Sequence, residues 1–139
     1  MIRTAILTLS LIGSLAACKP DAAPETVDWL GPDIIWQVQE IDGIAVPEGI
    51  EVTLSSPEPG LIAGSSGCNR YNGRIEVDGA IVKVGALAGT RMACAPEAMA
   101  VEQRFHSEIG RADRVARSGD ALELSRQGVV ILRATRQGA

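Results

Sequence analysis

The N-terminal segment constrains this fold most, because residues 1–17 are typical of a leader that is cleaved off before the domain folds. Arg3 is the one basic residue there, and an apolar run from Ala5 to Leu15 leads into Ala16-Ala17-Cys18. A charged start, a short apolar run and small residues before a cysteine are typical of a bacterial lipoprotein signal. The run is shorter than the about 20 apolar residues that span a bilayer. We therefore expect cleavage after residue 17.

The mature protein is then expected to begin at Cys18, with acyl chains on its sulfur and amino group, so that the membrane is its first partner. Two or more acyl chains give a stable anchor, whereas one gives only marginal binding. Lys19 follows the cysteine, where an aspartate would by the enteric sorting rule retain the protein in the inner membrane. This favours the periplasmic face of the outer membrane. The alternative is a soluble protein with an apolar N-terminal helix, but nothing later in the chain supplies a partner for such a helix.

Removal of residues 1–17 leaves 122 of the 139 residues, which is enough for one domain. Residues 18–33 are polar, small and punctuated by prolines, which predicts a flexible tether, and residues 34–139 are expected to form the domain. The chain has a net charge of −4 and no long run of like-charged residues, and aromatic residues make up only 3% of it. A nucleic-acid-binding surface is therefore not expected.

Cys68 and Cys94 remain after the anchor cysteine is set aside. In an oxidising compartment such an even pair predicts a disulfide. Chain-entropy arithmetic gives about 3–4 kcal/mol for a loop of this length. The alternative is a reactive thiol or redox couple, but the chain has no Cys-x-x-Cys, and its one histidine is distant in sequence from both cysteines.

Short strands dominate the rest of the chain. Alternating or β-branched apolar residues and Gly-containing turns predict antiparallel strands, at residues 34–41, 50–55, 61–64, 71–77, 81–84, 114–117, 122–124 and 129–132. One helix is expected near residues 96–109. Pro96 suits its first position, an apolar stripe runs from Ala98 to Ile109, and Gly110 is a reasonable end. The fold class is thus α+β and mostly antiparallel β.

Two motifs resemble signatures of the META domain family. Residues 64–73 read Gly-Ser-Ser-Gly-Cys-Asn-Arg-Tyr-Asn-Gly and resemble its "G-x-x-GCNxYxG" signature. Residues 90–94 read Thr-Arg-Met-Ala-Cys and resemble its "T-x-MAC" signature. Glu102 and Phe105 resemble the "E-x-x-F" of the family's helix. The resemblance extends over about residues 34–134.

The resemblance implies a strongly curved sheet or cracked barrel closed by one helix, with the two motif loops meeting in space. The family includes HslJ-like heat-shock lipoproteins of the bacterial envelope, and its members are associated with stress response and envelope maintenance. No catalytic residues come with the resemblance, so none are carried over to this chain.

The loop after Cys68 holds the polar residues most open to a functional interpretation. Arg70 offers a planar fork for a carboxylate or phosphate, and Tyr71 offers an amphipathic face. Arg91 could join Arg70 in a small anion site. The structural alternative is that Asn69 adopts left-handed backbone geometry in a turn and that Gly73 relieves a bulge.

The sequence gives little indication of a catalytic site or a metal site. His106, four residues after Glu102, is expected to be a solvated helix residue with an ion pair available. No nucleophile–base pair is evident, and one histidine with scattered carboxylates does not make a zinc set. We therefore expect no enzyme activity, metal or cofactor.

The function expected from these features is that of a lipid-anchored, non-enzymatic binding or accessory module in envelope maintenance or stress response. The alternative is a periplasmic carrier of a lipid or other hydrophobic ligand. That ligand would contact the inward faces of the curved sheet, formed by Val52, Leu54, Val82 and Val84.

Overall fold

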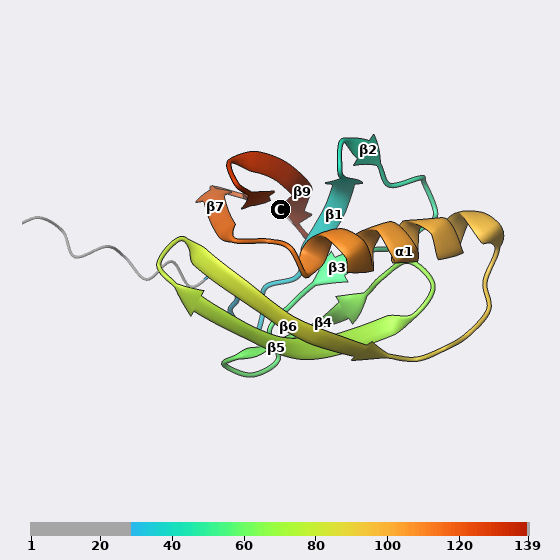
Figure 1. The fold of residues 1–139 in the computed structure, drawn as a ribbon, viewed down its shortest axis with the longest axis horizontal. Helices are drawn as coiled ribbons and strands as arrows, with labels where there is room; N and C mark the ends of the chain where they lie inside the picture. The colour runs from blue at the N-terminus through green and yellow to red at the C-terminus, as the bar shows by residue number, and fades with distance from the viewer. Residues whose placement is uncertain (1–28, 139) are drawn as a thin grey trace, which may run out of the picture.

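The structure is a computed structural model, and it describes residues 29–138. Nine strands and one helix follow one another in this part of the chain (Figure 1). Their bounds are β1 Trp36–Ile41, β2 Ile44–Ala45, β3 Thr53–Leu54, β4 Leu61–Ser65, β5 Arg70–Asp78, β6 Ile81–Gly89, α1 Pro96–Ile109, β7 Arg114–Ser118, β8 Ala121–Arg126 and β9 Val129–Arg136.

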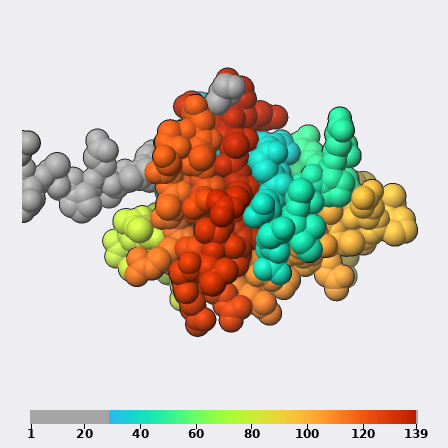
Figure 2. Space-filling view, turned by 90° about the horizontal axis from the view of Figure 1, so that it is seen from above, coloured from blue at the N-terminus to red at the C-terminus, as the bar shows by residue number. Residues whose placement is uncertain are grey.

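The strands form one antiparallel sheet in the order β2-β1-β9-β8-β7-β6-β5-β4, with β3 paired to β1 outside this path. The sheet curls into a half-barrel, and α1 lies between its two arms (Figure 1). β6 pairs with β7 at a single position, Ile81 with Arg114, so the two arms are joined there by little backbone pairing. From above, β9 lies beside β1, with β8 and β7 beyond it (Figure 2). The expected fold class, α+β with a curved sheet, is confirmed.

The helix begins and ends where its sequence predicted. Pro96 occupies the first turn, where its missing N–H costs nothing, and Glu97 faces the positive end of the helix dipole. No side chain caps the start, because Ala95 has no acceptor. Val101, Phe105 and Ile109 are buried, and they attach the helix to the concave face of the sheet.

A continuous apolar core fills the space between helix and sheet. Trp36 and Val38 of β1 are both buried on one face, as the alternation in that segment predicted. Phe105 of α1 packs against Tyr71 of β5, with ring centroids 4.9 Å apart. The two sheet arms close on the helix, and β3 links them, because it pairs with β1 while Ser55 beside it exchanges backbone hydrogen bonds with Ala63 of β4.

The domain begins earlier than expected. Trp29 falls within the segment assigned to the tether, yet it is 1% exposed and belongs to the core. Its carbonyl oxygen accepts a hydrogen bond of 2.7 Å from Nε1 of Trp36. Residues 29–33 thus belong to the folded unit, because a buried indole anchors them despite their polar and proline-containing sequence.

Candidate functional site

The two cysteine motifs meet in space, as the resemblance implied. Cys68 and Cys94 form a disulfide, with their Cα atoms 5.8 Å apart. The bridge joins the loop that precedes β5 to the segment between β6 and α1. Two segments 26 residues apart in sequence are thereby held side by side.

Asn69 is the centre of a hydrogen-bond network at this junction, and it is 3% exposed. Its Oδ1 accepts bonds from the Met92 backbone N–H at 2.7 Å and from Oγ1 of Thr90 at 2.9 Å. Its Nδ2 donates to the Met92 carbonyl at 3.3 Å and to Oε1 of Glu102 at 3.0 Å. The side chain thus uses both ends of its amide within the fold.

Glu102 brings the helix into this network. Its Oε2 accepts a bond of 2.7 Å from the backbone N–H of Asn69 and one of 2.9 Å from the hydroxyl of Ser66. Burial raises the pKa of Glu102, but the hydrogen bonds from Asn69 and Ser66, with the nearby charge of His106, oppose this effect. Together they hold the pKa below its usual value. The carboxylate is therefore favoured in its ionised form.

This network gives Asn69, Thr90 and Glu102 a structural role that needs no ligand. The expectation that Asn69 adopts left-handed geometry is wrong, since the described non-glycine residues with positive φ are Asp42 and Gln127. The amide is instead held by bonds to two other segments, residues 90–92 and the helix. The expectation for Gly73 is supported: the β5–β6 register shifts between Gly73 and Ile75, and a Cβ on Gly73 would lie 2.5 Å from Leu87.

Tyr71 lies in the core and not on a recognition surface. It is 2% exposed, and its hydroxyl donates a 2.8 Å bond to the carbonyl of Thr53. Burial raises the pKa of Tyr71, so the phenol stays neutral. An anion site at this loop could therefore use Arg70 and Arg91 but not an exposed Tyr71 ring.

Arg70 and Arg91 are both exposed. The backbone of Arg70 is fixed, because its N–H donates to Oγ1 of Thr90 at 3.2 Å and its carbonyl accepts from the Thr90 N–H at 3.1 Å. Arg91 is the next residue after Thr90. Arg91 therefore follows directly after the residue that is hydrogen-bonded to the backbone of Arg70. An anion site formed by the two arginines stays a prediction.

His106 is half-buried and packs against aromatic rings. Its ring makes edge contacts with Tyr71 and Phe105, at centroid distances of 6.1 and 5.6 Å. The anticipated ion pair with Glu102 is not formed within the described residues, because that carboxylate turns toward Asn69. His106 therefore remains partly open to solvent, where it borders the hollow beside β6, and it also packs against two aromatic rings, which the sequence did not indicate.

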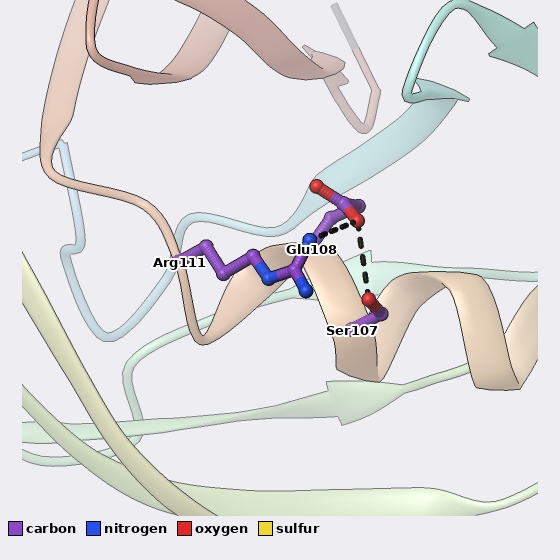
Figure 3. Close-up of polar contacts among 3 residues, drawn as sticks. All are labelled: Ser107, Glu108 and Arg111. Atoms are coloured by element: carbon purple, nitrogen blue, oxygen red, sulfur yellow. Dashed lines mark hydrogen bonds and ion pairs between the residues drawn. The ribbon is translucent and has the colours of Figure 1, made fainter.

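A buried carboxylate near the end of the helix was not anticipated from the sequence. Glu108, near the end of α1, accepts a 3.1 Å bond from Ser107 and lies 3.5 Å from Arg111 (Figure 3). A carboxylate is unfavourable near a helix C-terminus, and the arginine three residues later offsets this charge. The i, i+3 spacing was the available signal, and the role it indicates is structural.

The four residues expected to line a carrier cavity are packed into the core. Val52 and Leu54 are fully buried, and Val82 and Val84 are at most 8% exposed. Of these, Val84 borders a solvent-open hollow of about 420 Å³ between β6 and the end of α1. The concave face is thus largely filled by the protein's own side chains, with Phe105 as the largest from the helix.

Cys18 and residues 1–17 lie outside the described residues. Within residues 29–138, no helix is long and apolar enough to cross a membrane. The same part of the chain holds no group of three or more His, Cys, Asp or Glu side chains placed to bind a metal ion.

The fold and the clasped motif loops define a class of small α+β domain, a half-barrel sheet closed by one helix and stapled by a disulfide. The profile of the META domain matches residues 32–138. The chain belongs to the META domain family.

Two solved structures are similar to this chain. One is the NMR structure of a protein from Burkholderia xenovorans, with a TM-score of 0.63 and 26% identity, covering 87% of this chain and 98% of that one. The other NMR structure has a TM-score of 0.58 and 20% identity, covering 76% of this chain and 95% of the other, and it shares the fold. No curated protein matches the sequence.

Proposed function

We propose that the protein is a lipid-anchored envelope protein of the HslJ-like type, which acts as a non-enzymatic binding or accessory module in envelope maintenance or stress response. The observation that carries this proposal is the order of parts. A lipoprotein signal ending at Cys18 is followed, after ten residues, by a META domain whose core begins at Trp29. Such an order fits a domain tethered to a membrane surface.

The binding or accessory role is supported by how the motif residues are used. Asn69, Thr90 and Glu102 satisfy one another's hydrogen bonds, which leaves the exposed arginines as the loop's available polar groups. A carrier role is the alternative. The close packing of Val52 and Leu54 does not favour it, and a lipid that co-purifies in a native mass spectrum would restore it.

The anchor is tested by metabolic labelling with an alkyne-bearing palmitate in a Gram-negative host. We expect label in the wild-type chain and none in Cys18→Ser, and an inhibitor of lipoprotein signal peptidase should cause the precursor to accumulate. A wild-type chain without label contradicts the proposal.

Location and role need two further measurements. Sucrose-gradient fractionation should place the wild type in the outer membrane and Lys19→Asp in the inner membrane. A deletion strain should lose tolerance to envelope stress, such as heat or detergent, and regain it with the wild type but not with Cys18→Ser. Equal rescue by the wild type and by Cys18→Ser would show that the role in stress tolerance does not require the lipid anchor.

A further inference from the structure

The outer face of β5 carries two arginines. Tyr71 and Ile75 of β5 are buried, whereas Arg70, Asn72 and Arg74 are exposed. Because side chains of a strand alternate between the two faces of a sheet, these three residues share the convex face. They form the arginine face described below.

Small neighbours leave this face uncovered. Asn72 has Ala63 of β4 on one side and Ala88 of β6 on the other. Arg70 lies opposite Ser65 on β4. Directly opposite side chains contact one another across an antiparallel pair, so the short side chains beside Arg70 and Asn72 leave this part of the face open to a ligand. Arg74 lies opposite the longer Leu61 and is nevertheless exposed.

Neither arginine has an acidic partner within the described residues. The ion pairs found there involve Arg111 with Glu108, and Arg133 with Glu40 and Glu123. Two acids lie on the same face: Glu76 is directly opposite Lys83, which offsets its charge, and Asp78 lies at the far end of the strand, opposite Ile81. A protein with a net charge of −4 thus carries a locally positive surface.

The arginine face is also held rigidly. The backbone of Arg70 is bonded in both directions to Thr90, and the neighbouring Asn69 is fixed by its network and by the adjacent disulfide. A rigid platform reduces the ordering cost of binding. The planar fork of arginine matches the oxygens of a phosphate group.

The location of this face relative to the N-terminus indicates which phosphates it meets. The described chain begins at Trp29, which lines a hollow together with Ile75 and Val77 of β5. Ten residues separate Trp29 from Cys18, and ten extended residues span at most about 36 Å. A lipid anchor at Cys18 would therefore hold Trp29 within about 36 Å of the bilayer surface, a tether short enough for an outer face of the domain to meet that surface.

We propose that the arginine face binds phosphate groups of anionic phospholipids in the leaflet that holds the anchor. That the arginine face meets this leaflet in the cell rests on the lipid anchor proposed above. Its affinity for anionic lipid does not rest on that anchor. Each basic residue close to an anionic membrane strengthens binding about fivefold, and salt weakens the effect.

The test uses the chain from residue 18 with Cys18→Ser, which keeps every described element and removes the acyl chains. Binding is measured by flotation with vesicles of phosphatidylcholine alone and vesicles that also contain phosphatidylglycerol. We expect binding only to the second kind, with a loss at high salt. The double variant Arg70→Gln/Arg74→Gln should bind about 10–30-fold more weakly.

The matched control is Arg126→Gln/Arg136→Gln, which removes the same charge from exposed positions on β8 and β9. It should retain most of the binding. Equal loss in both double variants, or no binding by the wild type, overturns the proposal. Two further results would overturn it if the protein binds no vesicles. One is a set of chemical-shift changes at Arg70 and Arg74 on addition of inorganic phosphate, and the other is binding of a polyglutamate peptide. Palmitate labelling reports separately on the anchor, so the two failures are distinguishable.

Discussion

At the scale of single residues, Asn69 joins three segments that are distant in sequence. Its amide contacts the segment after β6 through Met92 and Thr90, and the helix through Glu102. Each partner is left with an unmet hydrogen-bonding group if the amide is removed, and such groups are costly when buried. A single side chain therefore substitutes for backbone pairing at this corner.

The substitution Asn69→Ala is expected to lower the free energy of unfolding by about 1–3 kcal/mol, because the four part-buried hydrogen bonds of its amide are lost. Urea unfolding followed by circular dichroism measures the change. Asn72→Ala, on the exposed side of the same strand, is the control and should stay within about 0.5 kcal/mol of wild type. Equal effects would show that the network contributes nothing specific.

Glu102 gives this junction a pH dependence. The folded protein holds the pKa of Glu102 below its usual value of 4.5, so the unfolded chain binds the proton more tightly. The carboxylate therefore stabilises the fold above the usual pKa, and this contribution is lost as the pH falls through that value toward the lowered one.

We expect Glu102→Gln to be less stable than wild type at neutral pH, by about 1–2 kcal/mol. The difference should shrink as the pH falls below 4.5. Thermal unfolding across a pH series measures it, with Glu51→Gln, at an exposed position outside the helix, as control. If the stability difference between Glu102→Gln and wild type does not change with pH, the ionised carboxylate is not the source of the stabilisation.

Part of this junction could be predicted from residues alone. The even cysteine pair indicated the disulfide, and the polar loop after Cys68 marked the corner. The partner of Asn69 on the helix could not be found by local spacing, because Glu102 is 33 residues away. The family resemblance and the spacing from His106 singled out that glutamate, but neither indicated its contact with Asn69.

At the scale of elements, Gly64 allows β3 and β4 to approach. A Cβ at this position would lie 2.1 Å from the carbonyl oxygen of Thr53 and 2.7 Å from its carbonyl carbon. Both atoms belong to backbone, which cannot turn aside as a side chain can. The same carbonyl accepts the Tyr71 hydroxyl, so a shift there would disturb the core.

The substitution Gly64→Ala is expected to cost about 2–3 kcal/mol, as is typical of overpacking. Gly85→Ala is the matched control in the same sheet arm, because its Cβ would meet only Arg74, at 3.5 Å from the nearest atom. Chemical denaturation of the two variants compares them directly. Equal stability would mean that β3 moves away freely.

The elements that could be predicted are those with a strong local signal. The helix over residues 96–109 matched because its apolar stripe, its proline and its glycine agreed. The expected strand over residues 50–55 contains only Thr53–Leu54 as β3, and Ile44–Ala45 was missed as β2. Two-residue strands exist only through their partners on β1, and such partners cannot be read from a local pattern.

At the scale of the whole molecule, the boundary of the folded unit is set by packing and not by composition. Residues 29–33 look like a linker, yet Trp29 fills part of the core. A tryptophan beside a proline-containing segment gives no periodic signal, which is why the expected boundary at residue 34 came too late.

A chain that begins at residue 34 is therefore expected to unfold more easily than one that begins at residue 29, by about 3–5 kcal/mol, the usual cost of losing a buried aromatic residue. A chain that begins at residue 19 should match the one from residue 29. Differential scanning calorimetry of the three chains measures this. Equal midpoints for all three would place Trp29 outside the cooperative unit.

The pairing of β1 with β9 has a consequence for when the molecule can fold. β1 is made first and β9 last, yet Trp36 of β1 lies opposite Arg136 of β9 in the register. Contacts between such distant positions raise the contact order and slow folding. The domain must wait until its last strand has been synthesised, so a ribosome-bound nascent chain that lacks residues 129–136 exposes its first strand to chaperones and proteases.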